Sequence, residues 1–314
     1  MASENNLTAV FTDIANAIRD KKGSVNTIKP INMADEILTI SSGVSVKDFI
    51  TTRNARYLFY DCGSLTSEQL ASVLKYDDTS GATNMYNMFY YCSNLTTIPL
   101  IDTSGATNME SMFNGCSNLT TIPQLDTSKA TKMSSMFRSC SSLTAIPQLD
   151  TSSCTSMSSM FSYCGKLTTV LQLDTSKVTD ISYMFQNCIS LTNIPQLNTS
   201  KATKMSSMFQ QCYKLEKIDI TKLVSGTNYN NHFASYCYSL KTLIIRTMDT
   251  IPTLNSNSFT DCYHFTGTVD ATYNPNGLKD GRIYVPDDKV ASLKTATNWS
   301  VFADIIKPLS EYVE

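Results

Sequence analysis

The cysteines are the residues in this chain whose type and spacing could do chemistry. Thiolates bind zinc, attack electrophiles or pair as disulfides, and each reaction needs a characteristic neighbourhood. Zinc sites use C-x-x-C pairs or nearby histidines, yet the sequence has no C-x-x-C and only two histidines, His232 and His264. Nine of the ten cysteines instead recur at intervals of 24 to 30 residues. They are Cys62, Cys92, Cys116, Cys140, Cys164, Cys188, Cys212, Cys237 and Cys262.

The neighbours of these cysteines favour burial over reactivity. A phenylalanine precedes each cysteine by three residues in every copy but one, and Leu or Phe follows three residues later. Because a buried thiol behaves as a small hydrophobic group, we expect a column of packed thiols. An occasional disulfide between adjacent turns remains open as the alternative. The tenth cysteine, Cys154, aligns with alanine or valine in the other copies, so we expect packing there and no catalysis.

A second column with chemical potential is made of carboxylates in the sequence Asp-Thr-Ser. Asx- and ST-turns satisfy such loops, so we predict that these side chains serve the turn. The alternatives are a cation bound along the column, or paired carboxylates that cleave glycosides. A repeated turn position gives every carboxylate the same environment, which disfavours acid–base catalysis. The column consists of Asp78, Asp102, Asp126, Asp150, Asp174 and Asn198.

The 24-residue period with recurring leucine predicts a leucine-rich repeat solenoid, whose turns have about 20 to 29 residues. In the copy at residues 116–139, the first apolar group lies in a Thr-rich segment typical of a strand. The second group follows i, i+3, i+4, i+7 spacing, which predicts a short helix. The second group is Met133, Met136, Phe137 and Cys140. The predicted fold is therefore an α/β repeat solenoid with parallel strands and short helices.

The repeat divides the chain into three regions. Residues 44–265 are predicted to form the solenoid, and residues 266–314 a C-terminal cap anchored by Trp299 and Phe302. Residues 1–43 are predicted to form a helical docking or oligomerisation module. Its helical stripe is too small to fold alone and is expected to dock on a particle. The stripe is Leu7, Phe11, Ile14 and Ile18.

Composition and charge exclude several classes of protein. The net charge is −2 and only 17% of residues are charged, so no basic surface points to nucleic acid. No stretch approaches the length of a membrane-spanning helix, and we expect none. The first residues include Glu4 and Asp13 and have no apolar core, so we expect no secretory signal peptide.

The motifs C-x-x-L-T-x-I-P and M-S-S-M-F resemble the BspA-like leucine-rich repeats of bacterial surface proteins and of their phages. The resemblance covers roughly residues 55–265. Residues 283–310, beginning Ile-Tyr-Val-Pro, look like the closing cap that often follows such repeats. The family resemblance implies adhesion or receptor binding, with a glycan or protein on the host surface as partner.

The N-terminal segment carries a second resemblance. Residues 14–23, Ile-Ala-Asn-Ala-Ile-Arg-Asp-Lys-Lys-Gly, with Ile28-Lys29-Pro30 and residues 33–37, resemble a short helical segment of phage tail, baseplate and fibre proteins. This implies a virion structural protein that assembles in the host cytoplasm and is displayed on the virion surface. Residues 1–43 would contact other virion proteins and could hold a homotrimer together.

Two other functions remain open. The chain could be a bacterial cell-surface adhesin, or an intracellular phage-encoded inhibitor that works by protein interaction. An enzyme is disfavoured because G-x-S-x-G, Walker and H-E-x-x-H motifs are absent from the sequence. We therefore expect no catalytic residue, no metal site and no cofactor.

Two surfaces are candidates for binding a partner. A column of glutamines beside the predicted strand suits a repeated ligand such as a polysaccharide, although a solvated column is the alternative: Gln124, Gln148, Gln172 and Gln196. Tyrosine is common in recognition surfaces and gathers in the irregular last turns. This second group is Tyr213, Tyr229, Tyr236, Tyr238 and Tyr263, with His264.

Overall fold

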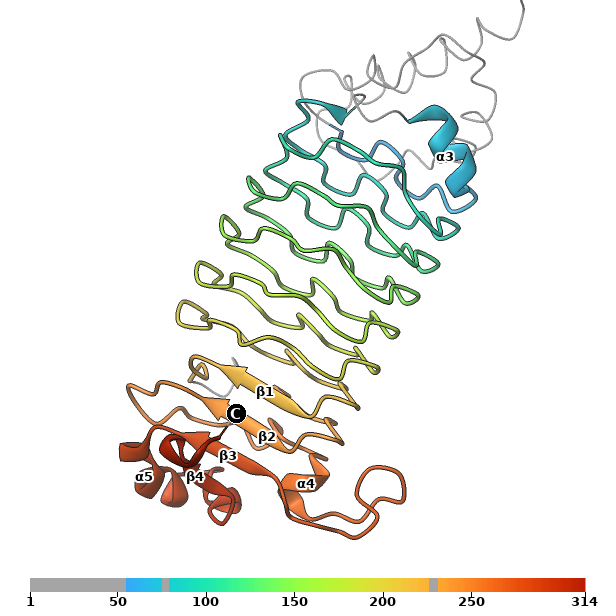
Figure 1. Cartoon of the computed structure of the whole chain (residues 1–314). Helices are drawn as coiled ribbons and strands as arrows, with labels where there is room; N and C mark the ends of the chain where they lie inside the picture. Colours follow the sequence, from blue (N-terminus) through green and yellow to red (C-terminus); the bar gives the residue numbers. More distant parts are fainter. Residues whose placement is uncertain (1–54, 75–78, 226–230, 314) are drawn as a thin grey trace, which may run out of the picture.

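Successive turns of the repeat stack along one axis into an elongated solenoid (Figure 1). The computed structural model describes residues 55–74, 79–225 and 231–313. The predicted N-terminal module, with its stripe of Leu7, Phe11, Ile14 and Ile18, lies outside the described residues, as do Asp78 and Tyr229. The predicted solenoid with a 24-residue turn is confirmed by the columns described next.

Equivalent side chains of neighbouring turns stack on one another inside the solenoid. The Met, Phe, Cys and Leu positions of the regular turns are almost completely buried and form one continuous core. Along the phenylalanine column, neighbouring rings lie nearly parallel with centroids 5.3 to 5.7 Å apart. The column runs through Phe59, Phe89, Phe113, Phe137, Phe161, Phe185 and Phe209. Each turn therefore buries its apolar residues against copies of itself.

Backbone hydrogen bonds join the turns in a regular alternation. The Phe113 amide donates to the Met136 carbonyl in the next turn at 2.9 Å, and the Gly115 amide to Arg138 at 2.8 Å. Between them, amides bond within their own turn, as the Cys116 amide does to the Phe113 carbonyl at 3.1 Å. Because this pattern recurs in each turn, the backbone of the Met–Phe–Cys segment is hydrogen-bonded both within its own turn and to the same segment of the next turn.

The short helix predicted within each repeat is wrong. Residues 134–139 form consecutive turns, and Ser135 and Ser139 adopt left-handed backbone conformations with φ of +56° and +59°. Left-handed residues at the same two positions recur in most turns and cannot continue a right-handed helix. The predicted burial nevertheless holds, since Met136 and Phe137 are fully buried. The apolar spacing correctly predicted which side chains face the core, but it did not determine the backbone conformation.

Regular strands occur only near the C-terminal end of the described residues. Between residues 79 and 216, the predicted strand segments show isolated parallel bridges, such as Thr169 with Asn193. Beyond them, four parallel strands pair in the order β1-β2-β3-β4 (Figure 1). These are β1 (Lys217–Ile220), β2 (Thr242–Ile245), β3 (Arg282–Val285) and β4 (Ile306–Pro308). The sheet thus continues from the solenoid into the region predicted as a cap.

Short helices lie at the two ends of the described structure. Helix α3 (Ser67–Val73) begins at the N-cap Thr66, which forms a capping box with Gln69. Near the other end are α4 (Tyr263–Thr266), α5 (Val290–Thr295) and three 3-10 helices, Asp287–Lys289, Ser300–Phe302 and Leu309–Glu311. Trp299 is fully buried, and its indole Nε1 donates to the Pro252 carbonyl at 2.8 Å. Phe302 is also buried.

The left-handed positions give a direct test of the turn geometry. Replacing Ser135 with valine should lower the free energy of unfolding by about 1–2 kcal/mol, because a β-branched residue is strained at positive φ. The matched control Ser135→Gly should leave it unchanged or raise it, since glycine adopts this conformation freely. Urea unfolding followed by circular dichroism measures both. Equal stability of the two variants would contradict the left-handed assignment.

Candidate functional site

The cysteine column is a hydrogen-bonded structural element. The Cys140 thiol donates to the Phe113 carbonyl of the preceding turn with an Sγ–O distance of 3.1 Å, and the same contact recurs along the column. All ten cysteines are free and buried, so the disulfide alternative is not observed. Burial raises the pKa of Cys116 and of Cys188 to about 12, which keeps both thiols protonated. The predicted packed thiols are confirmed.

Cys154 is packed in the same manner. Its side chain is fully buried, and its Sγ lies 3.2 Å from the Ser156 carbonyl. Burial raises its pKa to about 11. A thiol that is protonated and inaccessible is a poor nucleophile.

Among the described residues, one serine lies within hydrogen-bonding distance of a histidine ring, but the geometry of this pair does not suit nucleophilic catalysis. The Ser235 hydroxyl lies 3.2 Å from Nδ1 of His232. Ser235 is completely buried, so a substrate carbonyl has no path to its oxygen. Both residues belong to one turn of the repeat, and the hydroxyl also lies 3.4 Å from the His232 carbonyl.

The aspartate column serves the turns, as predicted. Oδ1 of Asp126 accepts from the Ser128 amide at 3.0 Å and from the Ser128 hydroxyl at 2.6 Å, and these bonds lower the pKa of the carboxyl. The intervening Thr127 is buried, and its hydroxyl donates to the Asp150 carbonyl of the next turn at 2.8 Å. In the described residues, no group of three or more His, Cys, Asp or Glu side chains could hold a metal ion.

The predicted glutamine column borders an open groove on the solenoid. Nε2 of Gln124 donates to the Leu125 carbonyl at 3.1 Å and to the Gln148 carbonyl of the next turn at 2.7 Å. Gln148 and Gln172 repeat this arrangement, while Gln196 supplies an accepting carbonyl. The groove has a volume of about 740 Å³ and is lined by three turns between Gln124 and Asp174. The amide nitrogens of the glutamines thus tie neighbouring turns together along the groove.

The tyrosines of the last turns come together as a tyrosine array, defined here as Tyr213, Tyr238, Tyr263 and Tyr273. Tyr238 lies between Tyr213 and Tyr263, with ring centroids 4.8 Å away on either side and nearly parallel planes. Tyr273 packs on Tyr238 at 4.9 Å with a tilt of 43°. Tyr236, another predicted residue, lies at the border, 6.5 Å from Tyr238.

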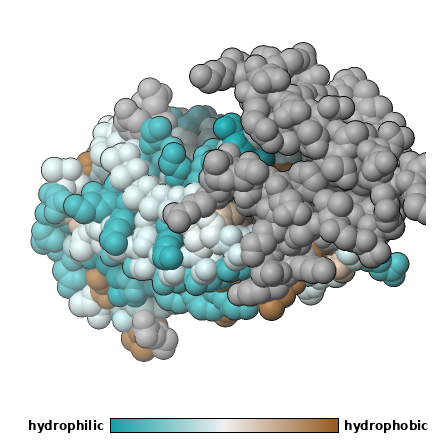
Figure 2. All heavy atoms as spheres, turned by 90° about the horizontal axis from the view of Figure 1, so that it is seen from above, coloured by the Kyte–Doolittle hydropathy of each residue, from teal (hydrophilic) through white to brown (hydrophobic). Residues whose placement is uncertain are grey.

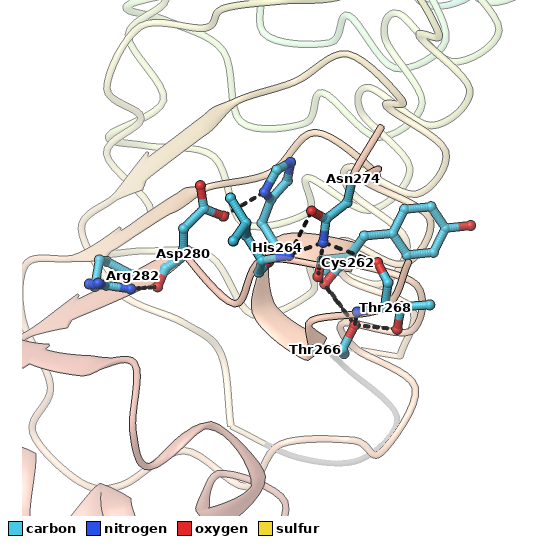
Figure 3. Close-up of polar contacts among 10 residues, drawn as sticks. Cys262, His264, Thr266, Thr268, Asn274, Asp280 and Arg282 are labelled. Atoms are coloured by element: carbon cyan, nitrogen blue, oxygen red, sulfur yellow. Dashed lines mark hydrogen bonds and ion pairs between the residues drawn. The ribbon is translucent and has the colours of Figure 1, made fainter. Parts of the chain in front are cut away.

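His264 does not share the exposed side of this array. It is buried, and its Nδ1 lies 2.6 Å from Oδ1 of Asp280 (Figure 3). The histidine therefore ties α4 to the end of the following loop instead of facing a partner. Sequence reasoning missed Tyr273, because this loop leaves the repeat and no period places its residues.

A second aromatic group, the N-terminal tyrosine cluster, also escaped sequence reasoning. The rings of Tyr60 and Tyr90 stack at 4.9 Å, and the Arg56 guanidinium lies 4.6 Å from the Tyr57 ring centroid. The cluster consists of Arg56, Tyr57, Tyr60, Tyr86, Tyr90 and Tyr91. The recurrence of tyrosine in the few residues before each of the first two cysteines, Cys62 and Cys92, was the signal that could have found it.

Several aromatic side chains remain open to solvent on the flank of the turns. Tyr91 is 50% exposed, and Tyr163 and Tyr183 are each 42% exposed. Figure 2, a view from the top of Figure 1, shows a described surface that is mostly hydrophilic with scattered hydrophobic residues. No helix in the described part of the chain is both long and apolar enough to span a membrane.

A protein-family model matches more than half of the chain. The family model described as "Mycoplasma protein of unknown function, DUF285" matches residues 53–169 and 141–242. The chain belongs to this family. Among solved structures, it is similar to the crystal structure of a leucine-rich repeat protein from T. pallidum. That match has 22% identity and a TM-score of 0.38, and covers 49% of this chain and 68% of the other. No curated protein matches the chain.

The membership shows a repeat-protein family with no known catalytic function. The finer resemblance noted in the sequence, to BspA-like repeats with a phage-type N-terminal segment, stays a prediction.

The thiol column yields a prediction about reactivity and pH. Native protein treated with iodoacetamide at pH 8 should show no modified cysteine by mass spectrometry, whereas urea-unfolded protein should show all ten. A Ser141→Cys control, at an exposed position, should react in the native state. Modified core cysteines in folded protein would contradict the assignment.

The same thiols predict a loss of stability in alkali. An unfolded thiol titrates near pH 8.5, while folded Cys116 and Cys188 titrate at about 12. Between these values the unfolded chain releases protons that the folded chain retains, so the free energy of unfolding must fall as pH rises. Urea unfolding at pH 7, 9 and 10 measures this. A constant urea midpoint would contradict raised thiol pKa values.

Proposed function

We propose that this chain is a binding protein of a phage particle, whose solenoid presents an extended surface to a glycan or protein on the host cell. The particle assignment rests on the resemblance of residues 14–37 to segments of phage tail, baseplate and fibre proteins. Residues 1–43 would join the chain to other virion proteins, as a homotrimer. The protein would assemble in the host cytoplasm and act at the virion surface.

The observation that carries the proposal is the contrast between the inner and outer positions of the turns. Inside the solenoid, Met, Phe, Cys and Leu recur with little change. Outside, the residues flanking each cysteine change from turn to turn and are mainly Ser, Asn, Gly, Gln and Tyr. The left-handed residue just before the cysteine, for example, is Tyr91, Ser139, Tyr163, Asn187 or Gln211 in different turns.

This composition suits recognition more than solubility. A surface that only needs to be soluble is served by charged residues, whereas tyrosine offers a large contact area with little loss of side-chain entropy. Serine, glycine and asparagine supply adaptable hydrogen bonds around such aromatic anchors. The glutamine-lined groove gives the solenoid a second repeated surface. A rigid stack holds both surfaces without rearrangement on binding.

Binding to whole cells tests the adhesion half of the proposal. Fluorescently labelled full-length chain is incubated with a panel of bacterial strains, mycoplasmas included, and cell-bound label is measured by flow cytometry. We expect saturable binding to at least one strain that a hundredfold excess of unlabelled chain abolishes. Binding to no strain, or label that the excess does not displace, would reject adhesion.

Immuno-electron microscopy tests the particle half. An antibody against residues 100–200 should label purified virions at the tail, baseplate or capsid surface. A strain lysogenic for the same phage with this gene deleted is the control. Absence of label on particles, with the protein on a bacterial envelope or in the cytoplasm, would leave the adhesin or the intracellular inhibitor.

A further inference from the structure

The repeat itself does not require the tyrosine array. In the regular turns, the position after the cysteine carries Ser93, Ser117, Ser141, Gly165 and Ile189. In the next three turns it carries Tyr213, Tyr238 and Tyr263. The cysteines before the tyrosines keep the thiol-to-carbonyl contact of the regular turns, so the stacking of turns does not depend on which residue follows. Three consecutive tyrosines at one surface position are therefore not required for this contact, although their rings stack on one another across the turns.

A tightly built loop completes the array. The chain leaves the repeat after α4 and returns at β3, and the intervening loop carries Tyr273 to Tyr238. Asn274 holds the loop from within: its Nδ2 donates to the carbonyls of Tyr263, Thr268 and Leu278 at 3.0 to 3.2 Å (Figure 3). Its Oδ1 accepts from the Leu278 amide at 2.9 Å.

The far end of this loop is fixed as well. The contact between His264 and Asp280 joins this end of the loop to α4. Gly281 lies so close to the Phe265 ring that a Cβ at this position would clash with the ring. Tyr273 is thus placed by a preorganised segment, and little entropy remains to be lost when a ligand binds the array.

The array offers both apolar and hydrogen-bonding surface. Within the described residues, no hydrogen bond engages the phenol oxygens of Tyr213, Tyr238, Tyr263 or Tyr273, and each ring is only partly buried. Burial raises the pKa of Tyr238 to about 12, so its phenol keeps its proton at neutral pH and can donate.

Carboxylates next to the array restrict the charge of a ligand. Asp261 and Asp270 lie close enough to add to the raised pKa of Tyr263, after the larger effect of burial. Their negative charge disfavours phosphate, sulfate or carboxylate groups on a ligand. Oδ1 of Asp270 already accepts the amides of Thr272 and Tyr273, so the other carboxylate oxygens are the ones that can accept hydrogen bonds from hydroxyl groups.

We infer that the tyrosine array is a preformed binding site for a neutral carbohydrate, one or two sugar units of a surface polysaccharide. A pyranose combines an apolar C–H surface with a rim of hydroxyls, which match the exposed parts of the tyrosine rings and the phenol and carboxylate oxygens respectively. This inference rests on the proposed function and names its ligand class. A protein ligand would need about 800 Å² on each side, more than a few side chains provide.

Titration with defined oligosaccharides tests the inference. Full-length chain is titrated with neutral hexaoses of glucose, mannose, galactose and xylose, followed by tyrosine fluorescence and calorimetry. We expect saturable binding of at least one hexaose. Tyr238→Ala should weaken its affinity at least tenfold and Tyr273→Ala at least threefold.

Matched variants separate recognition from folding. Tyr238→Phe keeps the stacked ring and removes only the hydroxyl, so it should fold normally and lose affinity by a smaller factor than Tyr238→Ala. Tyr183→Ala removes an exposed tyrosine outside the array and should bind like the unaltered chain. Circular dichroism and thermal unfolding confirm that each variant is folded.

Two results would overturn the inference: no hexaose binds the unaltered chain, or folded Tyr238→Ala and Tyr273→Ala bind as well as Tyr183→Ala. If cells bind the chain but no hexaose does, adhesion survives and the carbohydrate site is rejected. Loss of cell binding after protease treatment of the cells would then identify a protein receptor. If a hexaose binds and no cell does, the carbohydrate site stands and host adhesion is rejected.

Discussion

The structure depends on the bond that each buried carbonyl of the phenylalanine column makes with the next turn. The Phe113 carbonyl accepts the Cys116 amide within its own turn and the Cys140 thiol from the following one. The thiol thus takes the second lone pair of a buried carbonyl that the amide already satisfies, and this extra bond recurs in each turn. Cysteine suits this position because it is small enough to pack beside stacked rings and still carries a weak donor. This packing role accounts for the thiols without any redox or metal chemistry.

Stacking of similar turns also leaves some surface side chains free to vary from turn to turn. The left-handed residues before each cysteine turn the backbone so that their own side chains point away from the core. Because the inter-turn bonds at these positions use backbone atoms, the side chains are free to differ. Tyr163 and Asn187 thus occupy equivalent places in adjacent turns. A recognition surface can diversify on such a scaffold while the core stays constant.

The side chains of the polar columns also repeat from turn to turn, but they bond to the backbone. The side chains of Asp126, Thr127 and Gln124 form hydrogen bonds with the backbone of their own turn or of the next one. These backbone contacts explain why the same residue types recur in each turn. The tyrosine array differs, since its rings contact one another and the loop that bears Tyr273, and its phenols are not consumed by the fold.

The sequence by itself determined the parts of the protein that repeat. In a stack of 24-residue turns, the neighbours of a residue are its own copies one period away, so the buried columns, the packed thiols and the Asp-Thr-Ser turns could all be predicted. The tertiary structure decided what the period does not encode. Ser135 and Ser139 follow a left-handed path because bonds to the next turn outweigh local helix geometry, although the apolar spacing fits both. The meeting of Tyr273 with Tyr238, and of His264 with Asp280, depends on a loop without copies, whose contacts exist only once the chain has folded.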